Sequence, residues 1–97
     1  MSKVAEKHLS CLGYKAKDKV TGFSGVVDSV CFDLYGCIQV SLKPPVNAKG
    51  EVLNGYWFDI NRIKILSKSP VVKAPNFKAR YQAEGKQGAA DKPTERR

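Results

Sequence analysis

The stretch that decides the fold is KDKVTGFSGVV, residues 17–27. Its two glycines, Gly22 and Gly25, stand on either side of Phe23 and Ser24. Such a pair can either cradle a phosphate or turn the chain, and a phosphate loop leads into a helix whose N-terminus faces the anion. Here Gly25 leads instead into VVDSVCF, residues 26–32, which is rich in strand-forming residues. The glycines are therefore predicted to turn a β-hairpin.

The sequence that follows this hairpin predicts further short strands. After a turn at 33–36, residues 37–42 alternate apolar and polar side chains, as a half-buried strand does. Pro44 and Pro45 end that strand, and a polar loop leads to a short aromatic strand at 56–58. A single 3₁₀ turn at 59–62 precedes a closing strand at 63–66. With residues 20–21 as the first strand, this order predicts a mainly β fold, a small five-stranded SH3-like barrel.

The chain has 97 residues, the size of one domain, and its composition divides it into three parts. Residues 1–11 form an N-terminal extension, expected to be a short helix capped by Ser2. Residues 12–66 form the barrel. Residues 67–97 hold eight Lys/Arg against three acidic residues, with three prolines and few aliphatic side chains. We expect this basic tail to be disordered, because it cannot bury enough apolar surface to offset its conformational entropy.

The side chains that carry chemistry argue against an enzyme. The single histidine, His8, lies in the N-terminal extension, and the sequence has no nucleophile elbow, paired-histidine motif or Walker lysine. His8 with Cys11, Cys31 and Cys37 could form a Cys₃His zinc site, but their spacing is not that of a zinc knuckle. We predict no catalytic residue, no cofactor and no metal.

The cysteines and the apolar segments also bear on the compartment. Cys31 and Cys37 flank a predicted hairpin turn, so a disulfide between them is geometrically conceivable. No apolar run approaches the roughly 20 residues that span a bilayer, and the N-terminus lacks a signal-peptide stretch. We therefore expect no membrane association and a cytoplasmic protein, in which thiols stay reduced.

Three separate motifs carry a resemblance to a known group of proteins. DKVTGFSGVV (18–27), LYGCIQV (34–40) and GYWFDINRIKI (55–65) resemble, in this order, small uncharacterised phage and prophage proteins. The first hairpin is also similar to the leading strands of KOW and Tudor-like SH3 barrels, which bind nucleic acids or protein tails. The resemblance implies an SH3-like fold and a phage origin, covers residues 12–66, and brings no established activity.

The aromatic residues are the candidates for binding. We assign Phe58, Phe32 and Tyr56 to the core, so Trp57, on the other face of its strand, should be at least partly exposed. Phe23 is expected at the tip of the first turn and Tyr35 in the second. Exposed aromatics beside basic groups suit interfaces and base stacking. The predicted binding residues are Phe23, Tyr35, Trp57, Lys64, Lys78, Arg80 and Tyr81.

Two functions remain open at this stage. The formal charge is +8, but residues 12–66 hold seven basic against five acidic residues, so most of the excess lies in the tail. This modest charge on the barrel argues against a deep nucleic-acid groove and favours a non-enzymatic phage accessory binding module, whose partner the sequence leaves unresolved. A host or phage protein is expected as the partner, for example a host or anti-phage defence protein that the module inhibits. The alternative is a nucleic-acid-binding module that uses exposed aromatics and the lysine-rich tail.

Overall fold

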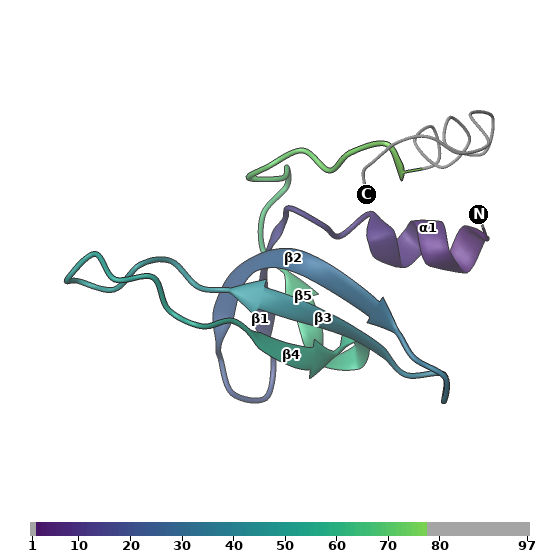
Figure 1. Cartoon of the computed structure of the whole chain (residues 1–97), viewed down its shortest axis with the longest axis horizontal. Coiled ribbons are helices and arrows are strands. Elements are labelled where there is room, and N and C mark those ends of the chain that lie inside the picture. The colour runs from purple at the N-terminus through teal and green to yellow at the C-terminus, as the bar shows by residue number, and fades with distance from the viewer. Residues whose placement is uncertain (1, 78–97) are drawn as a thin grey trace, which may run out of the picture.

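The structure, a computed structural model, describes residues 2–77. A short helix precedes five strands, with a 3₁₀ turn before the last strand. In chain order the elements are α1 (Lys3–Leu9), β1 (Lys15–Asp18), β2 (Ser24–Phe32), β3 (Ile38–Lys43), β4 (Tyr56–Asp59), η1 (Ile60–Arg62) and β5 (Ile63–Ile65). The strands form one antiparallel sheet in the order β4-β3-β2-β1-β5. The β2–β3 turn and the β3–β4 connection project from opposite ends of this sheet (Figure 1). The predicted mainly β fold and the N-terminal helix are confirmed.

The first strand differs from the prediction. It covers residues 15–18, before the turn, whereas residues 20–21 lie in the turn itself. The reason is the Asp18 carboxylate, which accepts hydrogen bonds from the backbone N–H groups of Val20 and Thr21 and so bends the chain. The later strands and the 3₁₀ turn lie within two residues of their predicted positions.

The two glycines of the opening stretch have different conformations. Gly22 has a φ of 82°, and its N–H donates to the Asp18 carbonyl at 2.8 Å. Gly22 therefore turns the hairpin, as predicted. Gly25 has no positive φ; it lies in β2, where an added Cβ would stand 2.4 Å from the carbonyl oxygen of Lys43 in β3. Gly25 thus permits a close approach of two strand backbones.

The core lies on one face of the sheet, where Ala16, Val27, Val40 and Leu42 are fully buried. Phe58 is half-buried against this cluster, in agreement with its predicted core position. The same prediction is wrong for two other aromatics, since the side chains of Phe32 and Tyr56 are 45% and 57% exposed. Both stand at strand ends beyond the buried cluster: Phe32 ends β2, and Tyr56 begins the edge strand β4.

The segments that flank the sheet contact β2, β1 and each other. The Gly13 N–H donates to the Val27 carbonyl at 2.8 Å, which joins the chain after α1 to β2. The Val71 N–H donates to the Gly13 carbonyl at 2.7 Å, and Ser67 Oγ accepts from the Lys15 N–H at 3.1 Å. Residues 67–71 therefore lie against the start of the sheet, which differs from the disordered tail expected from residue 67. The rest of that predicted tail from residue 78 lies outside the described residues.

None of the helices within residues 2–77 has the length and apolar character needed to cross a membrane.

Candidate binding surfaces

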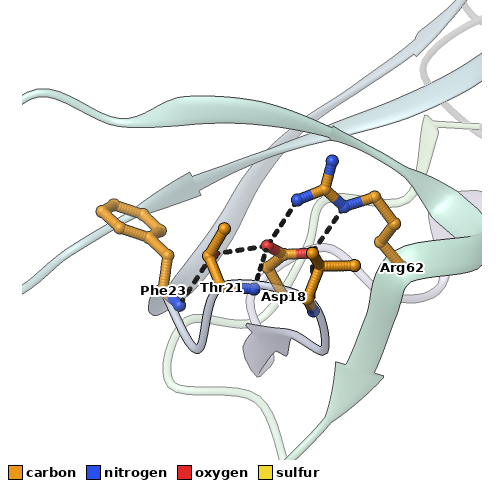
Figure 2. Close-up of polar contacts among 5 residues, drawn as sticks. Asp18, Thr21, Phe23 and Arg62 are labelled. Atoms are coloured by element: carbon orange, nitrogen blue, oxygen red, sulfur yellow. Dashed lines mark hydrogen bonds and ion pairs between the residues drawn. The ribbon is translucent and has the colours of Figure 1, made fainter.

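An ion pair between the buried carboxylate of Asp18 and the partly exposed guanidinium of Arg62 fixes the β1–β2 turn to η1 (Figure 2). Asp18 is fully buried, and its carboxylate accepts from Arg62 Nε and Nη2, both at 2.7 Å. It also accepts from the backbone N–H and the hydroxyl of Thr21. The Arg62 guanidinium, followed by these Thr21 bonds, holds the pKa of Asp18 well below its usual range despite the opposing effect of burial. Asp18 is therefore ionised, and its role is to hold the turn.

An aromatic cluster lies beside this pair. The centre of the Phe23 ring lies 5.4 Å from that of Tyr56, in an edge-to-face contact, and 5.5 Å from that of Phe58. The Arg62 guanidinium lies 5.4 Å from the centre of the Phe58 ring. Phe23 was expected to be exposed at the tip of the turn; it is instead half-buried against the core. The change follows from the turn geometry, because the Asp18 N–H donates to the Phe23 carbonyl and brings this residue to the end of the sheet.

The other predicted binding residues of the sheet do not form one cluster. Trp57 is 51% exposed on the outer face of β4, and Tyr35 is 85% exposed in the β2–β3 turn. Lys64 is exposed in β5, the strand at the opposite edge from β4. The remaining three, Lys78, Arg80 and Tyr81, lie outside the described residues.

Strand pairing brings together lysines that the sequence analysis did not connect. On the outer face, Lys17 of β1 stands directly opposite Lys64 of β5, and Lys15 and Lys43 flank Val26 on either side. Ser41 of β3 pairs with Trp57, which places Trp57 diagonally from Lys43, within reach of a long side chain. We call this run of residues the outer strip: Trp57, Lys43, Val26, Lys15, Lys17 and Lys64.

No carboxylate of the described residues balances the charges of the outer strip. Within residues 2–77 the ion pair between Arg62 and Asp18 is the only one, so none of the strip lysines has a carboxylate at ion-pair distance. The signal in the sequence was the alternation K-A-K-D at 15–18, which places two lysines on one face of a strand and Ala16 on the other. The lysine opposite Lys17 is Lys64, which lies 47 residues later in the chain, so only the strand register identifies this pair.

A groove of about 500 Å³ lies beside the outer strip. One side is the sheet, with Val26 of β2 and the residues Pro44–Pro45 that follow β3. The other side is the segment after β5, which supplies Leu66, Val71 and Val72. Its polar lining is Lys15, Lys43, Ser24 and Asp28. Asp28 stands at a bulge in β2, where the register shifts between Val27 and Ser29. The groove is therefore mostly apolar, with two strip lysines on its wall.

A second groove, of about 550 Å³, lies between α1 and the β5 edge of the sheet. It is lined by His8, Cys11, Tyr14 and the side chains of η1 and β5. The Cys11 thiol donates to the His8 backbone carbonyl at 2.9 Å, and burial raises the pKa of Cys11. The thiol is therefore protonated at neutral pH and bonded to backbone, and nothing in this groove activates it as a nucleophile.

Cys31 and Cys37 are free thiols on exposed positions of the β2–β3 hairpin. Cys31 stands opposite Gln39, so Cys37 is its diagonal neighbour on the same face, and diagonal pairs are about 7–8 Å apart, too far for an unstrained disulfide. The charge of Asp33 raises the pKa of Cys37. Within residues 2–77, no group of three or more His, Cys, Asp or Glu could hold a metal ion.

Comparison with protein-family models, curated proteins and solved structures gave no significant match.

Proposed function

We propose that this chain is a non-enzymatic nucleic-acid-binding module on an SH3-like barrel, of the phage accessory kind that its motifs resemble and acting in the host cytoplasm. A sheet whose first strand pairs with both the second and the last, with a 3₁₀ turn before the last strand, fits such a barrel. Residues 78–97, which hold six Lys/Arg against three acidic residues, add further positive charge to the same task.

The observation that carries the proposal is the cross-strand pair of Lys17 and Lys64. Like charges directly opposite each other destabilise a sheet, and no carboxylate of the described residues relieves this pair. An arrangement that costs stability in the free protein is explained when an anionic ligand lies across it. Lys15 and Lys43 continue the positive strip, and Trp57 offers a stacking surface at its other end.

Salt dependence of oligonucleotide binding tests the proposal. The double variant Lys17→Ala/Lys64→Ala should reduce the slope of log affinity against log salt by about 1.4 for a single strand, since each lost phosphate contact contributes about 0.7. The matched control is Lys3→Ala/Lys49→Ala, which removes the same charge from α1 and the β3–β4 connection. Equal effects of the two double variants would contradict a site on the outer strip. Absence of binding by the natural protein at low salt would reject the function.

A protein partner is the second candidate, and one observation favours it. Tyr56 is 57% exposed on the edge strand β4, and the edge-to-face contact with Phe23 fixes its ring. A rigid exposed tyrosine at a sheet edge is a typical interface anchor. A stoichiometric protein retained from host lysate after nuclease treatment, lost with Tyr56→Ala but kept by Lys17→Ala/Lys64→Ala, would support an inhibitor of a host or defence protein.

A further inference from the structure

The groove beside the outer strip combines a mostly apolar lining with two lysines and one carboxylate. Its apolar lining comes from two sides: Val26 with Pro44 and Pro45 on the sheet side, and Leu66, Val71 and Val72 on the other. The volume of about 500 Å³ is in the range of small-molecule sites, about 300–1,000 Å³. Such a space is suited to a flat, weakly polar group.

The segment after β5 is held in place to form one wall. The Val71 N–H donates to the Gly13 carbonyl at 2.7 Å, and Ser67 Oγ accepts from the Lys15 N–H. Gly13 has a φ of 89°, and a Cβ there would lie 2.0 Å from the Val72 carbonyl oxygen. The side chains of Val71 and Val72 are nevertheless 55% and 66% exposed, so they are positioned by backbone contacts and remain open to a ligand.

The groove lining carries charges of both signs. Lys15 and Lys43 line it and also belong to the outer strip, which continues through Lys17 to Lys64. Asp28 is the only carboxylate among the lining residues. It repels phosphate and can accept a hydrogen bond from the amino group of a base. A ligand with negative charges beside the lysines and a flat group that carries an amino substituent beside Asp28 would match both the positive and the negative groups of the lining.

We propose that this groove takes an unpaired base of a single-stranded nucleic acid, whose backbone phosphates lie along Lys15, Lys17, Lys43 and Lys64. This inference rests on the proposed function and specifies its ligand. A duplex can place its phosphates on the lysines, but its paired and stacked bases cannot enter the groove. The protein should therefore prefer single strands, because splayed bases gain contacts with apolar side chains that paired bases do not.

The experiment compares binding of a labelled single strand, an abasic strand of equal length and a duplex by the full-length protein, using fluorescence anisotropy. The natural protein should bind the single strand more tightly than the abasic strand. Val71→Ala/Val72→Ala shortens two of the three apolar side chains on that wall and leaves its backbone contacts. It should therefore weaken single-strand binding about five- to tenfold with no change for the abasic strand or duplex, and with an unchanged salt slope.

A matched control separates loss of the groove from loss of exposed apolar surface. Val46→Ala/Val52→Ala removes two valines of similar exposure, 55% and 74%, from the β3–β4 connection. This control should bind all three ligands as the natural protein does. Thermal midpoints of both variants should stay near that of the natural protein, which would show that the fold is intact.

The outcomes distinguish the groove from the wider function. One outcome would support phosphate binding and reject the base site. In that outcome Lys17→Ala/Lys64→Ala weakens binding, Val71→Ala/Val72→Ala binds as the natural protein does, and the natural protein binds the abasic strand as tightly as the single strand. If the natural protein binds none of the ligands at low salt, the function itself is wrong. If it retains a nuclease-resistant host protein that Val71→Ala/Val72→Ala releases, the groove is a protein site and the inference is overturned.

Discussion

Replacement of the two glycines of the opening stretch should produce two different kinds of damage. Gly22 has a φ of 82° and open space around it, so Gly22→Ala adds only backbone strain, about 1–2 kcal/mol. Gly25→Ala would put a Cβ 2.4 Å from the Lys43 carbonyl oxygen, whereas ordinary contact begins at 3.4 Å. The β2 and β3 backbones would have to separate by roughly 1 Å, and we expect a loss of about 3 kcal/mol or more.

Asparagine is the control that tells these effects apart. It adopts positive φ more readily than alanine, so Gly22→Asn should recover most of the stability lost in Gly22→Ala. Gly25→Asn should be at least as harmful as Gly25→Ala, because any Cβ meets the same carbonyl. Thermal melts measure the difference, since 1 kcal/mol shifts the midpoint of a domain this small by about 4–8 °C. Equal midpoints for Gly22→Asn and Gly22→Ala, or a mild Gly25→Ala, would refute the reasoning.

Three further predictions concern charge and exposure. Lys64→Glu places a negative charge opposite Lys17, so it should stabilise the fold by about 0.2–1 kcal/mol, seen as a slightly higher thermal midpoint, and weaken oligonucleotide binding. A lower midpoint in a folded variant would argue against a lysine pair that is kept for a ligand. The pKa of Asp18 in the folded protein lies below its unfolded value of about 3.9, so its contribution to the free energy of unfolding is complete above that pH and is lost as the pH falls further. Between pH 7 and pH 2 the urea midpoint should therefore drop more for the natural protein than for Asp18→Asn. Parallel curves would contradict this. Trp57→Ala should weaken single-strand binding about fivefold or more with an unchanged salt slope, as stacking releases few ions, whereas a reduced slope would place Trp57 elsewhere than on a base.

Local patterns were enough to predict most of the sheet. The β-branched run after Gly25, the alternation at 37–42 and the turn residues between them identify β2 and β3, because each signal lies within a few residues. The first strand had a weaker signal, a four-residue alternation with no β-branched residue. Its sequence KAKD is highly charged, and it becomes a strand because Ala16 faces the core and Asp18 finds Arg62, 44 residues later. A buried carboxylate cannot be anticipated without knowing its partner.

The candidate site was harder to predict than the fold, for a similar reason. Exposure of Trp57 followed from strand alternation, but the places of Phe23 and Phe32 depend on where the buried cluster ends. The lysines of the outer strip come from three strands, and their adjacency is a property of register. The groove requires residues 66–72, whose contact with Gly13 runs through backbone atoms and leaves no trace in side-chain pattern.

The small net charge of residues 12–66 concealed this strip because the acidic residues are occupied elsewhere. Asp18 is buried with its arginine, Asp33 accepts two backbone N–H groups in the β2–β3 turn, and Glu51 accepts from a side-chain amide at the tip of the β3–β4 connection. Asp59 accepts from the backbone at the start of η1. Four of the five carboxylates thus hold turns, and only Asp28 lines the groove. Because the acids serve local structure, a nearly balanced composition still leaves one face of the sheet positive, and the charge of a candidate binding surface must be read from its register.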